Sequence, residues 1–253
     1  MTTYIHLVRH AQGFHNLRAE NHQLPDPDLT PLGKHQCAEL CRLFPHHDQI
    51  THLVASPMRR TLYTCLLSFA PAVEAGKKVV ALPEVQEVSN LPCDVGTAPE
   101  KLHAEFDPAG TVDLSRVSEG WNDKSSGSKW APEMGNLEVR AREARNWLRE
   151  LGKEVTQEGT DAHIVVVTHG GFLHFLTQDW DGMTFEKGTG WANTEWRMYE
   201  FVSEDDGEAR LRETKSSWRG RRGSTTGLTE TEQMELRAAV GERIREEFGG
   251  EQQ

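Results

Sequence analysis

Arginine, histidine and glutamate residues follow four short apolar runs of this sequence, at residues 4–8, 52–55, 78–82 and 163–167. The residues concerned are Arg9 and His10, Arg59 and Arg60, Glu84 and Glu87, and His169. Arginine keeps its positive charge and offers a fork of N–H donors that fits two oxygens of a phosphoryl group. A neutral imidazole can act as a nucleophile, and a carboxylic acid can protonate a leaving oxygen and then, as a carboxylate, activate water. Brought together, these residue types suit the transfer of a phosphoryl group through a histidine.

The four apolar runs are typical of buried strands in a parallel sheet. Helical patterns separate them. The first helix is expected to begin where Thr30 caps it and Pro31 takes its first position. Further helices are expected over residues 58–69, after Asn136 as a cap, and after His169. Strands that alternate with helices predict a three-layer α/β/α sandwich with a mostly parallel central sheet.

Folds of this class bind ligands at the carboxyl ends of their strands. Because the arginines, histidines and glutamates stand directly after predicted strands, we expect them to converge on one anion pocket. Backbone N–H groups at Gly170 and Gly171, where a helix begins, add donors and a favourable dipole. The arginines favour the neutral form of a nearby histidine by like-charge repulsion. They and His169 are expected to neutralise the phosphoryl charge, so that neither a metal ion nor a cofactor is needed.

The α/β domain is expected to span residues 1–202. Within it, residues of about 90–136 are irregular and include the Ser/Gly-rich stretch "NDKSSGSKWAPEMG". Long irregular segments of this kind are usually functional loops, so we predict an insertion or lid over the pocket, with Trp121 and Trp130 as candidates to wall an organic substrate.

A C-terminal tail is expected over residues 203–253, with a helix near 229–248. Thr229 and Glu232 match a capping box at the start of that helix. The apolar residues that would share one face of it are Leu236, Val240 and Ile244.

Composition restricts the classes of function. The chain has 253 residues, a net charge of −11 and four cysteines. The charge argues against a nucleic-acid or membrane-surface binder, because either needs a basic face. Four cysteines are too few for a disulfide scaffold, and no Cys-x-x-Cys pair indicates a zinc site. No signal peptide is evident, and no run approaches the roughly 18 apolar residues of a spanning helix. We therefore expect a cytoplasmic protein whose partner is a phosphorylated small molecule.

Other hydrolytic mechanisms lack their residues in this sequence. A cysteine phosphatase loop needs Arg six residues after its Cys, and the sixth residue after Cys93 is Pro99. No Gly-x-Ser-x-Gly stretch is present for an acyl hydrolase, and no Walker-type loop for a nucleoside triphosphatase.

Three stretches of the sequence, in this order, resemble the signature blocks of the histidine phosphatase superfamily, also called the phosphoglycerate mutase-like family. They are "LVRHAQGFHN", "SPMRRTLYT" and "VVVTHGG", and the resemblance covers roughly residues 3–202. It implies a phosphoglycerate mutase-like fold. The residue after His10 is Ala11, where the family pattern has Gly, and alanine is small enough to replace it without removing any chemistry.

Carried over residue by residue, the resemblance implies that His10 is phosphorylated transiently and that Arg9 binds the phosphate beside it. Asn16 falls on the family's pocket asparagine. In the second block the family's arginine falls on Arg60, and in the third block His169 is the second pocket histidine.

The implied activity is that of a metal-independent phosphatase acting on a phosphate ester or diphosphate of an organic small molecule. Its proton donor is expected to be Glu87, at the start of the loop that leads over the pocket, with Glu84 as the alternative. Mutases that share these blocks carry Glu-Arg-x-Tyr-Gly after the third strand, where this chain has "QEVSNLPCDVG", so hydrolysis is favoured over mutase-type phosphotransfer. A non-catalytic phospho-ligand binding protein on the same scaffold is the other alternative, and the presence of both histidines, both arginines and a candidate acid argues against it.

Overall fold

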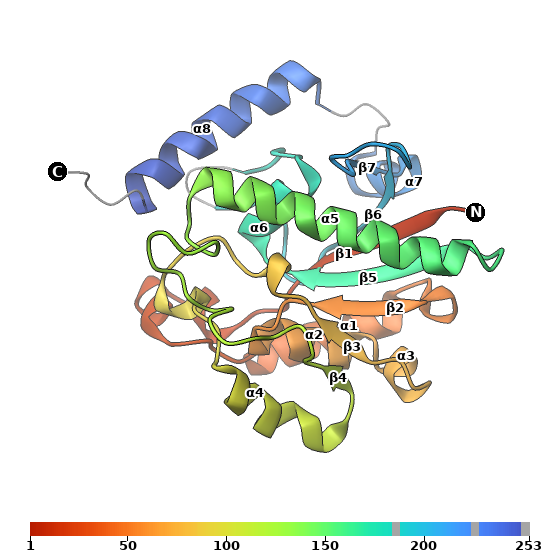
Figure 1. The fold of residues 1–253 in the computed structure, drawn as a ribbon, viewed down its shortest axis with the longest axis horizontal. Coiled ribbons are helices and arrows are strands. Elements are labelled where there is room, and N and C mark those ends of the chain that lie inside the picture. The colour runs from red at the N-terminus through yellow and green to blue at the C-terminus, as the bar shows by residue number, and fades with distance from the viewer. Residues whose placement is uncertain (184–187, 224–227, 249–253) are drawn as a thin grey trace.

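A seven-stranded sheet forms the centre of the computed structural model, which describes residues 1–183, 188–223 and 228–248 (Figure 1). Its strands lie side by side in the order β4-β3-β2-β5-β1-β6-β7. Their bounds are Thr3–Arg9 (β1), His52–Ala55 (β2), Val79–Ala81 (β3), Val112–Asp113 (β4), Ala162–Thr168 (β5), Trp196–Phe201 (β6) and Leu211–Glu213 (β7). The pairs among β1 to β5 are parallel, whereas β6 runs antiparallel to β1 and to β7. The predicted mostly parallel sheet is thereby confirmed.

Helices cover both faces of this sheet. They are α1 (Pro31–Leu43), α2 (Arg59–Ser68), α3 (Ala70–Glu74), α4 (Pro99–Phe106), α5 (Met134–Thr156), α6 (Gly170–Thr177), α7 (Lys215–Arg222) and α8 (Glu230–Phe248). Figure 1 shows α5 and α6 on one side of the sheet and α1 and α2 on the other, which is the predicted three-layer sandwich.

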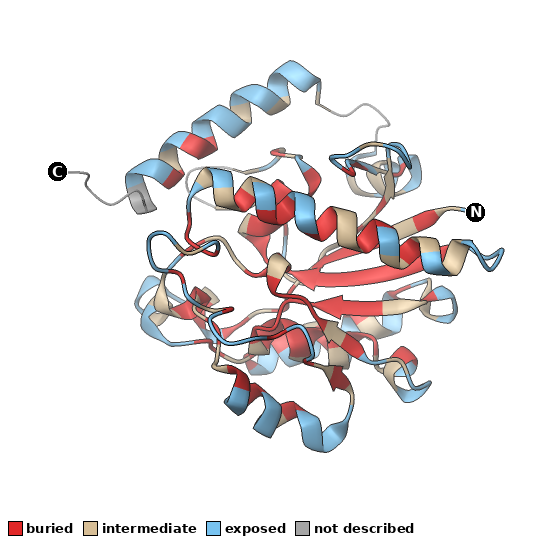
Figure 2. Ribbon diagram, viewed as in Figure 1, coloured by how far each residue is buried: buried red, intermediate tan, exposed pale blue. Residues whose placement is uncertain are grey.

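The position of β5 in the middle of the sheet explains why its sequence is a continuous apolar run. Ile164 and Val166 belong to the hydrophobic core on the α5 side, and Val165 and Val167 belong to the core on the α2 side. All four side chains are fully buried (Figure 2). Full burial of an aliphatic side chain contributes about 1.5–3 kcal/mol, so both faces of this strand must be apolar.

Strand register brings the candidate site residues to one edge of the sheet. Arg9, the last residue of β1, pairs with Thr168, the last residue of β5. The N–H of His10 then donates to the main-chain oxygen of Thr168 at 2.9 Å. On the other side of β5, Ala55 at the end of β2 pairs with Val167. The chain therefore leaves β1, β2 and β5 at neighbouring points.

Helix caps show where local sequence signals were right and where they were wrong. The Thr30 hydroxyl accepts the N–H of Gly33 at 3.0 Å, which confirms the predicted start of α1. The expectation that Asn136 caps α5 is wrong, because α5 begins at Met134 and Asn136 lies in its first turn. There the Asn136 amide donates to the main-chain oxygen of Ser128 at 3.1 Å, so that it ties the helix to the preceding loop.

The segment of about 90–136 contains α4 and the short strand β4, which was not predicted. Trp121 and Trp130 are both buried within it. After residue 202 the chain adds β7 to the sheet and continues through α7 to α8. The predicted capping box is present at α8, where the Glu232 carboxylate accepts the N–H of Thr229 at 2.7 Å. Among the described residues, no helix combines the length and the hydropathy that crossing a membrane requires.

Candidate active site

A cavity of about 230 Å³ lies where β1 and β5 end. Among the predicted site residues, those that line it are Arg9, His10, Asn16, Glu87, Gly170 and Gly171. Arg60 and His169 are fully buried beside it. Glu84 does not line the cavity, and its carboxylate lies 3.9 Å from the ammonium group of Lys129 instead. The structure therefore brings Glu87, and not Glu84, to the histidines.

His10 is held in the protonation state that a nucleophile needs. Its Nδ1 lies 2.8 Å from the main-chain oxygen of Ala11. Since a carbonyl oxygen only accepts hydrogen bonds, Nδ1 carries the proton and Nε2 carries the lone pair. Burial, and after it the positive charges of Arg60 and Arg9, lower the pKa of His10 well below 6.5. The predicted like-charge repulsion thus contributes, but burial is the larger cause of the neutral state.

His169 lies against His10, with 5.3 Å between the ring centroids. Arg60 Nη2 donates to His169 Nδ1 at 3.1 Å, because a guanidinium has no acceptor. The ring proton is therefore on Nε2, which donates to the hydroxyl of Ser56 at 2.9 Å. Burial and Arg60 also lower the pKa of His169, so this ring is neutral. To bind a phosphoryl oxygen, its N–H must change partner from Ser56 to the substrate.

Arg9 and Arg60 each have one side-chain N–H donor without a hydrogen-bond partner among the described residues. Arg60 donates through Nη1 to the main-chain oxygen of Cys93 at 2.7 Å and through Nη2 to the Asp94 carboxylate at 2.8 Å. Arg9 donates through Nη1 to the main-chain oxygen of Trp191 at 2.5 Å. The Nε atoms of Arg9 and Arg60 are buried and have no hydrogen-bond partner among the described residues. A buried donor without a partner costs about 1–3 kcal/mol, and an anion that accepts a hydrogen bond from it removes that cost.

Glu87 caps the start of α6 with its carboxylate. Oε1 accepts the N–H groups of Val88 and Phe172, both at 2.9 Å, and Oε2 accepts that of Gly171 at 3.2 Å. The Gly171 N–H, which was expected to serve a phosphate, thus donates to Glu87 in this structure. A Cβ at Gly171 would lie 2.7 Å from Glu87 Oε1, so the close approach of the carboxylate requires glycine here.

The environment of Glu87 favours its protonated form. Burial, and then the negative charge of Asp94, raise the pKa of Glu87. Hydrogen bonds from Val88 and Gly171 and the charge of Arg60 oppose that shift without cancelling it. A carboxyl group with a raised pKa can act as a general acid near neutral pH.

Asn16 and His15 complete the wall next to His10. The Asn16 side-chain oxygen accepts the N–H of Gly13 at 3.0 Å. His15 is buried with its ring centroid 5.4 Å from that of His10, and its Nδ1 has no partner in the described part of the chain. Burial and the charge of Arg60 lower the pKa of His15 to about 2. His15 is thus a third neutral imidazole at the cavity. It lies in a short 3-10 helix, Phe14–Asn16, and no spacing pattern in the sequence singled it out.

Sequence reasoning missed three residues that hold the site, two from the insertion and one from α5. Lys124 is buried, and its ammonium nitrogen donates to the main-chain oxygen of Glu87 at 2.7 Å. Asp94 pairs with Arg60, as described above. Arg140 of α5 donates to the main-chain oxygen of Gln86 at 2.9 Å. Neither Asp94 nor Lys124 belongs to a motif, and only the fold brings them to the strand ends.

A second histidine cluster lies away from the cavity. His6 Nε2 and His163 Nδ1 are 3.0 Å apart, and the ring centroid of His46 is 5.1 Å from that of His6. Burial and the neighbouring His163 lower the pKa of His6 to about 3. Within the described residues, neither this cluster nor any other set of three His, Cys, Asp or Glu side chains is arranged to hold a metal ion.

Comparison with known proteins places this site in a family. The sequence matches the model of the Histidine phosphatase superfamily (branch 1) over residues 5–215. Phosphoglycerate mutase-like protein 2 of Arabidopsis thaliana is 43% identical over 75 residues, which are 26% of this chain and 22% of that protein. The matched segment thus spans about a fifth of that relative's length.

Two solved structures show that the fold is shared. A mycobacterial glucosyl-3-phosphoglycerate phosphatase is 20% identical, with a TM-score of 0.50 over 83% of this chain and 96% of that one. A phosphoglycerate mutase from Bacillus anthracis is 13% identical, with a TM-score of 0.50 over 84% of this chain and 92% of that one. The family match covers most of the chain and includes all three signature stretches, so this protein belongs to the histidine phosphatase superfamily.

Proposed function

We propose that this protein is a phosphatase that hydrolyses a phosphate ester or diphosphate of an organic small molecule through a phosphohistidine at His10, without a metal ion. The observation that carries the proposal is the pair of buried Nε–H donors on Arg9 and Arg60 beside a neutral His10. Two guanidinium groups with free donors favour a doubly charged phosphoryl group, and a neutral imidazole is the form that attacks phosphorus.

In the first step, Nε2 of His10 attacks phosphorus and the bond from phosphorus to the ester oxygen breaks. Glu87 gives its proton to that oxygen, and the alcohol leaves. Oε2 accepts a single N–H, that of Gly171 at 3.2 Å, whereas Oε1 accepts two at 2.9 Å. Oε2 is therefore the oxygen with room for the acidic proton. Arg9 and Arg60 stabilise the charge on the transferring group by preorganised donors.

In the second step, the Glu87 carboxylate takes a proton from water as the water oxygen attacks phosphorus. The bond from phosphorus to His10 breaks, which returns a neutral imidazole and a protonated Glu87 and releases inorganic phosphate. The hydrogen bond from His10 Nδ1 to Ala11 keeps Nε2 oriented through both steps.

The test uses the full chain and p-nitrophenyl phosphate, followed by a panel of phosphate esters with detection of inorganic phosphate. His10→Ala is expected to abolish turnover, and addition of EDTA is expected to leave the activity of the unchanged protein intact. Quenching with a labelled substrate should trap an acid-labile, base-stable phosphoryl group on the peptide that contains His10. Turnover by the His10→Ala variant, or loss of activity with EDTA, would refute the proposal.

A matched pair of variants separates the two adjacent arginines. Arg60→Ala is expected to lower kcat/KM by about 10²–10³-fold, the usual effect of removing one donor to the transition state. Arg59→Ala removes the same charge one residue away, where the guanidinium contacts the carboxylates of Glu105 and Asp28 instead, and should leave kcat/KM within about twofold. Phosphate binding without turnover would support the non-catalytic alternative, and transfer of the phosphoryl group to a second substrate hydroxyl would support the mutase alternative.

A further inference from the structure

The C-terminal helix α8 forms part of the wall of the cavity at the ends of β1 and β5. Val240, Arg243 and Ile244 of this helix line the same cavity as His10 and Arg9. The family match ends at residue 215, so these three residues come from a part of the chain that the match does not include.

Specific contacts fix α8 over the body of the domain (Figure 1). The Gln233 side chain accepts the N–H of Trp180 at 2.7 Å and donates to the Asp179 carboxylate at 2.8 Å. Arg237 pairs with Glu138 of α5. Because these contacts come from the first half of the helix, they set the position of the second half, where the cavity-lining residues lie.

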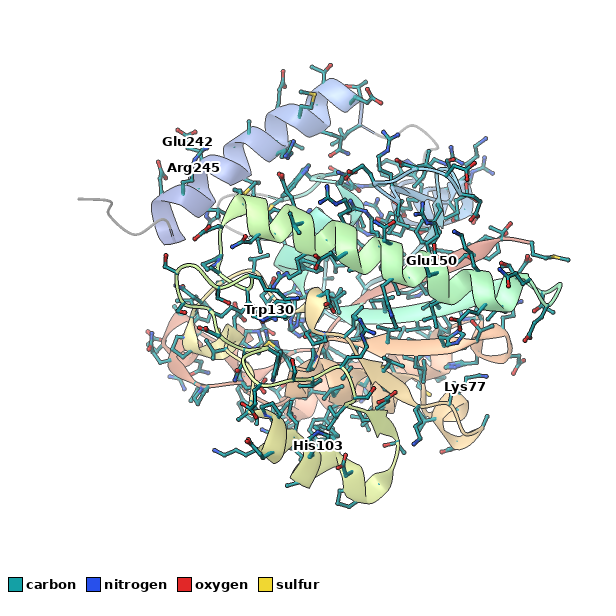
Figure 3. All side chains as sticks on the ribbon, viewed as in Figure 1. Lys77, His103, Trp130, Glu150, Glu242 and Arg245 are labelled. Carbon is teal, nitrogen blue, oxygen red and sulfur yellow. The ribbon has the colours of Figure 1, made fainter. Side chains whose placement is uncertain are left out.

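The side of α8 that faces the domain is apolar. Val240 and Ile244, one helical turn apart, are only 8% and 7% exposed and belong to the core that includes Phe175. Figure 3 labels Glu242 and Arg245 on the same helix, and both are exposed. The helix therefore presents two branched aliphatic side chains and Arg243 to the cavity, whereas Glu242 and Arg245 face solvent.

Other apolar residues line the cavity beside the two aliphatic residues of α8, namely Val88, Leu91, Phe175 and Met183. Polar residues such as Ser89 and Thr189 line the rest of it. Its volume of about 230 Å³ is below the usual range of roughly 300–1,000 Å³ for sites of drug-sized ligands. An apolar cavity of about 150 Å³ already holds a benzene molecule. The apolar part of the cavity thus suits a ring-sized apolar substituent on the phosphoryl group.

We infer that Val240 and Ile244 determine substrate specificity, and that the substrate is a phosphate monoester of a small aromatic or branched aliphatic alcohol. This inference rests on the proposed phosphatase function and adds a size limit set by α8. Removing the two aliphatic side chains should admit larger apolar esters, whereas enlarging one of them should exclude aromatic esters. Neither change touches the groups that carry the chemistry.

The experiment compares kcat/KM for phenyl phosphate, naphthyl phosphate and glycerol phosphate. The unchanged full chain is expected to prefer phenyl phosphate to both others. In the Val240→Ala/Ile244→Ala variant, the ratio of naphthyl to phenyl phosphate should rise by about tenfold or more, the usual effect of pocket changes of this size. Val240→Trp should lower kcat/KM for phenyl phosphate by about tenfold or more, mainly through KM, and leave glycerol phosphate nearly unchanged.

Two control variants on the same helix show whether the effect is local. Leu236→Ala shortens an aliphatic side chain that packs against the same core but does not line the cavity, and Glu242→Ala changes an exposed residue. Both should keep the substrate ratios of the unchanged protein.

The outcomes also separate this inference from the proposed function. Absence of turnover with every ester would defeat the proposed function itself. Robust turnover with ratios that are unchanged in the double variant, or that shift equally in Leu236→Ala, would defeat only the assignment of Val240 and Ile244. A preference of the unchanged protein for glycerol phosphate would contradict the inferred substrate class.

Discussion

Asp94 and Arg60 form a buried ion pair near His10, the proposed nucleophile, and replacing Asp94 by Asn tests the role of the pair directly. Arg60 Nη2 and Asp94 Oδ1 are 2.8 Å apart, and the two side chains are 0% and 10% exposed. Removing one partner of a buried pair usually costs about 3–5 kcal/mol, because the other charge is left uncompensated. The amide oxygen of Asn still accepts a hydrogen bond from Arg60, so we expect a loss of about 2–3 kcal/mol of unfolding free energy. For a chain of this size that corresponds to a melting temperature lower by about 4–12 °C.

Two further effects of Asp94→Asn follow from the charges around Arg60. A bound phosphate supplies the missing negative charge, so phosphate should raise the melting temperature of the variant more than that of the unchanged protein. Asp94 also raises the pKa of Glu87, whereas Arg60 lowers it. With the Asp94 charge removed, the pKa of Glu87 falls. Because Glu87 must carry a proton to act as the acid, the alkaline limb of kcat/KM should move to lower pH.

Thermal unfolding with and without saturating phosphate, together with the pH profile of kcat/KM, measures all three effects. Ser89→Ala is the matched control, because it removes the hydroxyl that donates to Asp94 Oδ2 and leaves the charge in place. If Asp94→Asn gained no more from phosphate than Ser89→Ala does, or if the alkaline limb stayed where it was, the electrostatic account of Arg60 and Glu87 would be wrong.

Three other variants have defined outcomes. Gly171→Ala puts a Cβ 2.7 Å from Glu87 Oε1, so kcat should fall by about tenfold or more. Gly135→Ala adds a Cβ that meets nothing within 4 Å and should leave kcat unchanged in the same assay. Lys124→Met removes the bond to the main-chain oxygen of Glu87 and should lower kcat more than it raises KM, which steady-state kinetics resolves. His6 has a pKa of about 3 when folded and about 6.5 when unfolded, so the unfolded state binds more protons between these values and stability falls as pH drops from 6.5 toward 3. In His6→Leu, the free energy of unfolding measured with urea should depend less on pH across that range. If the pH dependence were unchanged, groups other than His6 would cause the loss of stability in acid.

The general arrangement of the site could be predicted from the sequence, because its main residues directly follow the ends of predicted strands. The apolar runs that end at Val8 and Val167 belong to parallel neighbours, and their register alone places His10 beside His169. Nothing more than the strand pattern and the residues after it is needed for that step. The cap at Thr30 was predictable for the same reason, since it is a local hydrogen bond between residues three apart.

Details of the site that depend on long-range contacts were not predictable. Asp94 reaches Arg60 across 34 positions of the chain and Lys124 reaches Glu87 across 37, from a segment without periodicity. The face of α8 was visible in the spacing of Val240 and Ile244, but no local signal says which cavity that face covers. The hydrogen bond from the Gly171 N–H to Glu87 was not predictable either, because the two residues are far apart in the sequence.

The protonation state of Glu87 should govern both substrate binding and proton transfer. Arg9 and Arg60 bring two positive charges, the ionised Asp94 offsets one of them, and Arg243 also lines the cavity, while His10 is neutral. A protonated Glu87 leaves this net positive charge for the incoming phosphoryl group, and an ionised Glu87 reduces it. In the proposed mechanism the positive charge of the site falls when Glu87 gives its proton to the leaving alcohol, at the moment when a carboxylate is needed to activate water.

Binding and turnover should therefore weaken together as pH rises through the pKa of Glu87. Above about pH 6 an aryl phosphate is mainly a dianion, so changes of KM and kcat with pH then reflect the protein and not the substrate. We expect KM to rise over the same pH interval in which kcat falls. Glu87→Gln, which is always neutral, should bind the aryl phosphate with no such pH dependence while it turns over slowly. A KM that stays constant while kcat falls would mean that the acid and the charge that holds the phosphoryl group are separate.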